Sequence, residues 1–416
     1  MAIHAKELQN AEKENTQEMI EWLSSFGKTK NEGVTRLLYS KAWCQAQRAL
    51  KHKMEQIGLN TYFDCVGNLF GKLQGLAVES PCILTGSHVD TVVEGGKYDG
   101  AYGIIASLIA VSRLFETYGY PKKTIEVVSF CEEEGSRFPL TFWGSRNTNG
   151  FYTLDHIRNI TDAEGISFLE AMKQAGFDPA YYQTPIRKDI ERFIEVHIEQ
   201  GMVLEKNQKT IGLVTHIVGQ RRYLVRIKGE SNHAGTTPMS YRKDAVVTAS
   251  QLISFLTNKA KEIDSHLVAT VGKIEVSPNV PNVVAGEVKF SLDIRHHKAE
   301  ILDQYCQAIF SECRQLSEAL NTEIEFSQWM DVTPVAMDEQ LLKVIRNIAV
   351  QKNLPFQDIV SGAGHDAQVF ASKIPANLIF VPSKDGISHN PKEFTSLEEL
   401  EMGIELLTEV LYQLAY

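Results

Sequence analysis

The chain of 416 residues is long enough for two domains, and 43% hydrophobic with 23% charged residues is typical of globular proteins. A formal charge of −10 and an isoelectric point of about 5.7 argue against a nucleic-acid-binding or anionic-membrane-binding surface. The sequence has no bilayer-spanning apolar run, no signal-peptide core and six scattered cysteines without a CxxC pair, so we expect a reduced cytoplasmic protein.

The first part of the chain alternates between helical and strand-like patterns. Helices are predicted over 6–27, 35–57 and 100–119. Strands are predicted over 68–75, 81–88, 123–135 and 192–201. A last strand, 377–383, precedes a closing helix over 396–415. This alternation predicts an α/β domain built on a mixed, mostly parallel sheet.

The middle of the chain has a different pattern, in which strands dominate. Strands are predicted over 221–230, 269–279, 288–297 and 323–330, with helices over 241–258 and 299–319. We interpret 216–330 as a compact α+β unit inserted into the first domain, which then comprises 1–215 and 331–416. The four tryptophans are expected in the cores: Trp22, Trp43, Trp143 and Trp329.

Side chains that can bind a cation gather near the ends of the predicted strands. They are His88, Asp99, an acid from the run Glu132, Glu133 and Glu134, His197 and His389. In open α/β sheets, ligands bind at the carboxyl ends of the strands. Each motif alone is ordinary, since a single histidine is usually a core or surface residue. Together, imidazoles and carboxylates suit zinc, manganese, cobalt or nickel better than calcium.

These groups outnumber the ligands that one tetrahedral zinc ion needs. Two metal ions bridged by one carboxylate would use them all, and such a pair, roughly 3.5–4 Å apart, can activate water and polarise a carbonyl. The glutamate run then has one acid left to act as a general base. Asp90 can orient His88 through the other ring nitrogen.

Six motifs carry a family resemblance that covers almost the whole chain, from about residue 37 to the end. In chain order they are "GSHVDTVVEGGKYDGAYG", "EEEGSRF", "HIEQG", "NHAGTTPM", "GAGHDAQ" and "SHNPKE". The chain resembles the M20-type binuclear metallohydrolases, in the subgroup of allantoate amidohydrolases and N-carbamoyl-L-amino-acid hydrolases. "GQRRYLVRIKGESNHAGTTPM" and "VSGAGHDAQ" are most similar to the allantoate branch. The resemblance implies an aminopeptidase-like catalytic domain with an inserted lid domain that also forms a homodimer.

The resemblance also implies roles for the cation-binding groups, with two divalent ions (Mn²⁺ or Zn²⁺) per subunit. Asp99 would bridge the ions, with His88 and His197 on one side and Glu134 and His389 on the other. Glu133 would be the general base. The family places the functional pair directly before Gly135, which favours Glu133 and Glu134 over the register that starts at Glu132.

Further residues outside this set are similar to the family's substrate-binding groups. His233 resembles a histidine that stabilises the oxyanion in the partner subunit's active site, although a polar turn would also explain it. Arg295 could clamp a substrate carboxylate or form a surface salt bridge. Gln220 and Asn282 resemble amides that bind ureido or carboxylate groups, and each could equally be a turn residue.

The segment "SGAGHDAQ" is the other candidate for substrate binding. The main-chain N–H groups of Gly362 and Gly364 suit an anion, but an ordinary capped helix start would explain the segment as well. His365 could contact substrate or lie behind the ligands, and we do not interpret it as a ligand.

The function implied by the resemblance is hydrolysis of a ureido C–N bond in a small molecule. Allantoate would give ureidoglycine, which decays to ureidoglycolate, with ammonia and carbon dioxide, in purine (allantoin) degradation. The run Gln220, Arg221 and Arg222 favours allantoate, whose second ureido group needs polar partners. The alternatives are an N-carbamoyl-L-amino-acid hydrolase, a metal-free ureide-binding paralogue and a dimetal aminopeptidase.

Overall fold

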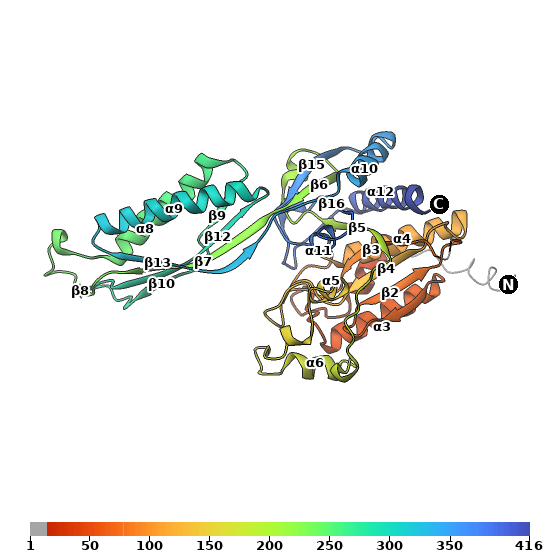
Figure 1. Cartoon of the computed structure of the whole chain (residues 1–416), viewed down its shortest axis with the longest axis horizontal. Coiled ribbons are helices and arrows are strands. Elements are labelled where there is room, and N and C mark those ends of the chain that lie inside the picture. Colours follow the sequence, from red (N-terminus) through yellow and green to blue (C-terminus); the bar gives the residue numbers. More distant parts are fainter. Residues whose placement is uncertain (1–14, 78) are drawn as a thin grey trace. The chain divides into compact units, whose positions relative to one another are not determined.

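The computed structural model describes residues 15–77 and 79–416 and divides into two compact units (Figure 1). The first unit extends to Thr215 and also contains Met337–Ile359 and His365–Tyr416. The second unit contains His216–Ala336 and Val360–Gly364. It therefore continues beyond residue 330, where the sequence suggested a boundary, because its last long strand extends to Val332.

A nine-stranded sheet forms the centre of the first unit, although its edge strand and the ends of two other strands fall within the residue ranges of the second unit. Its strand order is β1-β2-β4-β3-β5-β16-β6-β14, and β15 also pairs with β6. The strands are β1 (Asn60–Phe63), β2 (Leu69–Leu73), β3 (Cys82–His88), β4 (Ile125–Phe130), β5 (Ile190–Ile198), β6 (Ile211–Ile217), β14 (Val335–Ala336), β15 (Phe356–Ser361) and β16 (Ala376–Val381).

The four strands β4, β3, β5 and β16 run parallel in the middle of this sheet, while β1, β2 and β6 pair antiparallel beside them. Every residue of β3, β4 and β16 is buried, as expected for parallel strands covered on both faces. The predicted mixed, mostly parallel sheet is confirmed. The carboxyl ends of the four central strands meet at one edge, where the polar groups after β3, β4 and β5 gather.

Helices cover this sheet. They are α2 (Thr16–Ser24), α3 (Lys41–Gln56), α4 (Ala101–Tyr118), α5 (Trp143–Thr148), α6 (Phe168–Gln174), α7 (Val203–Lys206), α10 (Glu339–Gln351), α11 (Asp366–Ala371) and α12 (Leu397–Ala415), with short 3₁₀ turns η2 (Leu154–His156), η3 (Pro179–Tyr181) and η5 (Lys384–Gly386). The apolar helix α4 packs against α12 and against β3, β4 and β5. Its buried face explains why so few of its residues are polar.

For two of the predicted helices, the structure gives different bounds within the described residues. The part of the predicted helix 6–27 that precedes residue 15 lies outside the described residues, and α2 ends at Ser24. The helix predicted over 35–57 begins at Lys41, because Ser40 caps it by accepting a hydrogen bond from Trp43 N. The preceding segment is not helical, and it buries the guanidinium of Arg36 among main-chain carbonyls.

The second unit is an antiparallel sheet with two long helices. The sheet has the order β10-β12-β7-β13, with β9 also paired to β12, and β8 pairs with β11 in a separate ribbon. The elements are β7 (Gly219–Lys228), β8 (Asn232–His233), η4 (Met239–Tyr241), α8 (Ala245–Ile263), β9 (Val268–Thr270), β10 (Ile274–Ser277), β11 (Val283–Val284), β12 (Glu287–His296), α9 (Ala299–Ala319) and β13 (Glu323–Val332).

The strands of this sheet bury alternate residues. Along β12, Val288, Phe290, Leu292 and Ile294 are buried with residues of α8 and α9, while the residues between them are partly exposed. This period of two gives the sheet one face covered by helices and one polar face.

Substituting Phe290 with alanine is expected to lower the free energy of unfolding by about 3–5 kcal/mol, because it leaves a cavity in the second unit's core. The matched substitution is Leu224→Ala, on the neighbouring strand β7 and on the opposite face of the sheet. It should lower the free energy of unfolding by less than about 1 kcal/mol, since Leu224 is 43% exposed. Urea unfolding of both variants measures the difference. Equal losses would contradict the assignment of faces.

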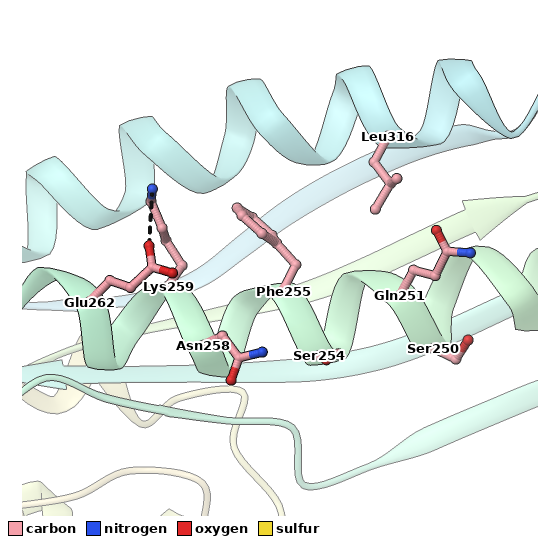
Figure 2. A pocket seen from close by; sticks show the side chains of 8 residues that line it. All are labelled: Ser250, Gln251, Ser254, Phe255, Asn258, Lys259, Glu262 and Leu316. Atoms are coloured by element: carbon pink, nitrogen blue, oxygen red, sulfur yellow. Dashed lines mark ion pairs between the residues drawn. The ribbon is translucent and has the colours of Figure 1, made fainter.

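A hollow of about 560 Å³ lies between α8 and α9 (Figure 2). Its lining includes Phe255 and the ion pair of Lys259 with Glu262 from α8, and Leu316 from α9. It contains none of the predicted site residues. Among the described residues, no helix is long and apolar enough to cross a bilayer.

Candidate metal centre

The predicted cation-binding residues of the first unit come together at the carboxyl edge of its sheet. His88 is the last residue of β3, Glu133 and Glu134 follow β4, and His197 is near the end of β5. His389 lies beyond β16 and η5, in a left-handed backbone conformation with φ of 54°. A non-glycine residue in that conformation is strained, and such strain is common at functional sites.

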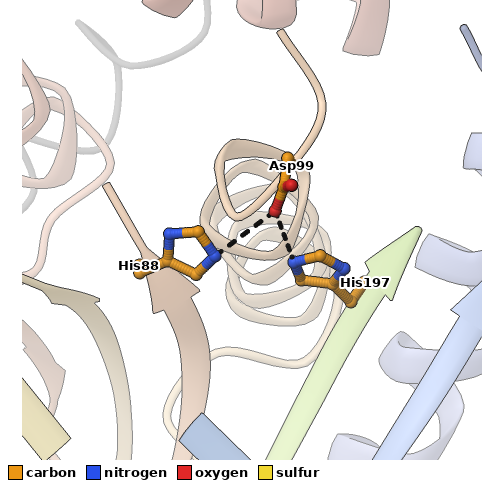
Figure 3. A group of neighbouring side chains, drawn as sticks. All are labelled: His88, Asp99 and His197. Carbon is orange, nitrogen blue, oxygen red and sulfur yellow. Dashed lines mark ion pairs between the residues drawn. The ribbon is translucent and has the colours of Figure 1, made fainter. Parts of the chain in front are cut away.

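Asp99 is the residue on which this cluster centres. Figure 3 shows it just before α4, between His88 and His197. Asp99 Oδ1 is 3.4 Å from His88 Nε2 and 3.1 Å from His197 Nε2. Asp99 Oδ2 is 3.1 Å from His389 Nε2. The two oxygens of one carboxylate therefore face different sets of imidazoles, as a bridging ligand requires.

Gly100 makes this close approach possible. Its φ is 63°, and a Cβ at this position would lie 2.5 Å from ring atoms of His88. Any side chain here would displace the histidine or the loop that carries Asp99. The glycine after Asp99 is therefore a steric requirement of the cluster.

Three overlapping groups of donor atoms lie close enough to hold cations. In each group the donor atoms are within 4.8 Å of one another: His88, Asp99 and His197; His88, Glu133 and Glu134; and Asp99, Glu134 and His389. His88, Asp99 and Glu134 each belong to two groups. Glu132 belongs to none of them, so the geometry favours the register in which Glu133 and Glu134 face the centre.

The histidine rings are oriented by the main chain. His88 Nδ1 is 3.1 Å from Asp90 O, and His197 Nδ1 is 2.9 Å from Ile198 O. These contacts leave the Nε2 atom of each ring directed at Asp99, and His197 Nε2 also accepts a hydrogen bond from Gly100 N. Metal-binding histidines typically donate their other ring N–H to a carbonyl or carboxylate in this way.

The Asp90 side chain is buried behind the centre. Its Oδ1 is 3.3 Å from His88 Nδ1 and accepts a hydrogen bond of 3.0 Å from Glu133 N. Its Oδ2 accepts one of 3.2 Å from Glu134 N. Asp90 thus holds both the imidazole and the backbone that carries the two glutamates. Arg36 lies nearby, and its burial lowers the pKa of its guanidinium to about 10.

The centre buries several carboxylates close together without enough positive charge to keep them all ionised. Burial raises the pKa of Glu133 well above its usual value, and burial together with Asp99 raises that of Glu134 to about 8. Glu134 Oε1 is buried without a hydrogen-bond partner among the described residues. A hydrogen bond with Asp99 raises the pKa of His389 to about 9. Divalent cations would satisfy these oxygens, and they would compete with protons for the same donors.

Several supporting residues were missed by the sequence analysis. Glu393 Oε1 accepts hydrogen bonds from Tyr98 N (2.9 Å) and Asp99 N (3.1 Å), so it fixes the loop that carries Asp99. Gln200 Nε2 donates to Asp99 Oδ2 at 2.8 Å. Glu393 lies in the motif "SHNPKE" and Gln200 in the motif "HIEQG". Their place in these motifs was the only feature of the sequence that could have indicated their role.

A second buried layer lies behind His197. Glu195, two residues earlier on β5, accepts hydrogen bonds from Ser87 Oγ (2.7 Å) and Ala367 N (2.8 Å). The strand period of two could have identified it, because it shares a face with His197. The ring of His365 is 4.6 Å from that of His197, and burial holds the pKa of His365 well below its usual value. His365 is in none of the three donor groups.

The remaining predicted site residues belong to the second unit. His233 is exposed in the β8–β11 ribbon, and its Nδ1 accepts hydrogen bonds from Gly235 N (3.0 Å) and Thr236 N (3.2 Å). Asn282 is exposed just before β11, and its main-chain oxygen accepts from Ala234 N. Gly362 and Gly364 lie in Val360–Gly364, and Gly362 O accepts a hydrogen bond of 2.8 Å from Arg295 Nη1.

Comparison with known proteins identifies the family. The sequence profile described as Peptidase family M20/M25/M40 matches residues 84–413, a range that includes the second unit, most of the first unit and all the residues of the cluster. The chain belongs to the M20/M25/M40 peptidase family.

Relatives of this M20/M25/M40 family member match over almost their whole length. An allantoate amidohydrolase of Bacillus subtilis is 46% identical over 404 residues, covering 97% of this chain and 98% of the relative. An N-carbamoyl-L-amino-acid amidohydrolase of a Pseudomonas species is 36% identical over 402 residues, covering 95% and 97%. The crystal structure of a hydantoinase/carbamoylase-family amidase from Burkholderia multivorans has a TM-score of 0.91 at 32% identity, covering 96% of each chain. The predicted family and fold are confirmed.

Proposed function

We propose that this protein hydrolyses a ureido C–N bond and that its substrate is allantoate. The observation that supports this most directly is the single carboxylate of Asp99 between two sets of donors, with Glu133 beside them. The allantoate amidohydrolase of Bacillus subtilis is more similar to this chain than the Pseudomonas N-carbamoyl-L-amino-acid amidohydrolase. The enzyme is thus an amidohydrolase of linear ureides.

The donor set fits two divalent ions per subunit. His88 and His197 would hold one, Glu134 and His389 the other, and Asp99 would bridge them. When bound, the ions would lower the pKa of a water molecule and polarise the ureido carbonyl. Imidazole and carboxylate donors suit Mn²⁺ and Zn²⁺ alike, so we propose that cellular supply decides between them.

The protein's own groups then move the protons. Glu133 accepts a proton from the attacking water and passes it to the nitrogen that leaves the carbonyl carbon. Allantoate and water give ureidoglycine and carbamate, and the carbamate decomposes to carbon dioxide and ammonia. Asp90 holds Glu133 through the main chain, so the base stays in place while its charge changes.

We also propose a homodimer in which the second unit acts as the lid and contributes His233 to the partner. Because main-chain N–H groups donate to His233 Nδ1, a neutral ring carries its proton on Nε2. That N–H is suited to stabilise an oxyanion in the partner subunit. The free cysteines in the described residues support our proposal of a cytoplasmic location.

Mixed dimers test this arrangement. Dimers of His233→Ala and Glu133→Gln subunits should recover about a quarter of wild-type activity, since half of the dimers would contain one intact site. Each variant alone should be nearly inactive. Activity in the mixture no higher than that of the separate variants would contradict a shared site.

For substrate binding we propose Gln220, Asn282, Arg295 and the main-chain N–H groups of Gly362 and Gly364. Arg295 would take the substrate carboxylate. Arg221 belongs to the other face of the sheet, because it pairs with Asp303 of α9 and Asp331 of β13. Only Gln220 and Arg222 of the polar run therefore support the choice of allantoate.

Ammonia release tests the proposed function. Chelated protein, with Mn²⁺ or Zn²⁺ restored, should release ammonia from allantoate, and its metal content should rise in parallel. Turnover of an N-carbamoyl-L-amino acid but not of allantoate would support the proposed mechanism and contradict the proposed substrate. No turnover and no metal uptake would indicate a ureide-binding paralogue instead.

A further inference from the structure

The polar face of the second unit's sheet brings together four side chains from β7 and β12. The strands pair antiparallel, with Asp293 opposite Arg222 and Arg295 opposite Gln220. Their neighbours Leu292 and Ile294 are buried on the helix-covered face. The four polar side chains therefore share the open face, and we refer to them as the Asp293 cluster.

Asp293 accepts hydrogen bonds from all three other members. Its Oδ2 accepts from Gln220 Nε2 at 2.7 Å, Arg222 Nε at 2.8 Å and Arg295 Nη2 at 3.1 Å, and its Oδ1 accepts from Arg295 Nε at 3.0 Å. Burial raises the pKa of Asp293, but the hydrogen bonds and charges of Arg295 and Arg222 outweigh burial and hold that pKa below its usual value. The cluster has two positive charges and one negative charge.

These contacts fix what the other side chains can offer to a ligand. Gln220 uses its amide N–H on Asp293, so its carbonyl oxygen is left as an acceptor for a donor such as a ureido N–H. Arg295 uses Nε–H and one N–H on each terminal nitrogen, on Asp293 and Gly362 O. One N–H remains on each terminal nitrogen for a carboxylate.

Arg222 is held as well. Besides its hydrogen bond to Asp293, its guanidinium lies 5.2 Å from the ring centroid of Trp329, which is 58% exposed on β13. Asp293 is thus the only member that contacts every other member of the cluster. Removing its charge would free both guanidiniums and the amide at once.

We propose that Asp293 is a positioning residue for substrate specificity. It presents the carbonyl of Gln220 to a ureido group and the terminal nitrogens of Arg295 to a carboxylate, and the net positive charge it leaves favours a monoanionic ureide. This inference rests on the proposed function, in which Gln220 and Arg295 bind substrate.

The test compares Asp293→Asn with the matched control Asp331→Asn in the metal-loaded enzyme. Asp331 also pairs with an arginine of β7, but it contacts Arg221 on the other face. Asp293→Asn should raise KM for allantoate about 10- to 100-fold with kcat within about 3-fold, because hydrogen bonds that orient ground state and transition state alike are lost. Asp331→Asn should change KM less than about 2-fold.

Two further variants separate positioning from a general structural effect. Asp293→Glu keeps the carboxylate and should give a KM between those of the wild type and Asp293→Asn. If Asp293 acts through Arg295, the KM increase in Asp293→Asn combined with Arg295→Lys should be smaller than the product of the single increases. If Asp293→Asn does not fold, Asp293→Glu alone and combined with Arg295→Lys provides the same comparison.

Wild-type turnover of allantoate with an unchanged KM in Asp293→Asn would overturn this inference and leave the proposed function intact. Equal KM increases in Asp293→Asn and Asp331→Asn, or fully multiplicative effects with Arg295→Lys, would also overturn it. Wild-type enzyme without any ureide turnover would instead contradict the proposed function, and this inference with it.

Discussion

Replacing Glu133 by glutamine is expected to lower kcat for allantoate by about 10²- to 10⁴-fold, the contribution of a well-placed general base. Glutamine has nearly the same shape but cannot accept the proton of the attacking water. Metal content should be close to that of the wild type, because Glu133 is outside the proposed ligand set. Steady-state ammonia release and metal analysis on the same sample measure both quantities.

The neighbouring glutamate is the control for this experiment. Glu132 is also a buried glutamate, but its side chain accepts a hydrogen bond from Gly135 N and takes no part in the donor groups. A glutamine at 132 can still accept that bond, so Glu132→Gln should keep kcat within about 10-fold. A large loss of kcat in Glu132→Gln with full activity in Glu133→Gln would show that Glu132, and not Glu133, is the general base.

Replacing Asp99 by alanine is expected to abolish both metal binding and turnover. Its two oxygens face different imidazole sets, so the substitution would leave each ion with about two protein ligands, fewer than the usual three or four. Metal content after mild dialysis should fall from about two ions per subunit to near zero. Circular dichroism would check that the fold survives.

His389→Ala and Ser388→Ala are the controls for that experiment. His389 belongs to one donor group only, so its loss should remove one ion and retain the other. Ser388 Oγ is 3.3 Å from Asp99 Oδ2 but would not bind an ion, so Ser388→Ala should retain both. Retention of both ions in Asp99→Ala would contradict a bridging carboxylate.

The sequence was informative wherever local pattern and strand ends determine the structure. In open α/β sheets, ligand-binding groups follow the carboxyl ends of the parallel strands, and these ends lie at one edge of the sheet. His88, the glutamate run and His197 could therefore be expected at one edge before their distances were known. Asp99 could be included only through the family resemblance of its motif, because "YDG" alone indicates a turn. The roles of these residues as ligands and base remain predictions.

Long-range contacts and side-chain faces were less accessible to sequence analysis. Trp43 and Trp143 are buried as expected, but Trp329 is exposed, because the polar face of β13 carries it beside Arg222. Arg221 and Arg222 are adjacent in sequence and point to opposite faces of a strand. Glu393 contacts the Asp99 loop across nearly 300 residues of chain, and no local pattern encodes such a pairing.

The hydrogen bonds from the Asp99 loop to Glu393 also bear on when the enzyme can mature. During synthesis, the segment that includes Asp99 leaves the ribosome tens of seconds before Glu393 and His389 are made, at roughly 5–20 residues per second. A nascent chain therefore cannot assemble the complete donor set. Binding of the ion that Glu134 and His389 would hold becomes a step that follows translation, and a chain truncated before residue 389 would lack a ligand of that ion regardless of how well its sheet has folded.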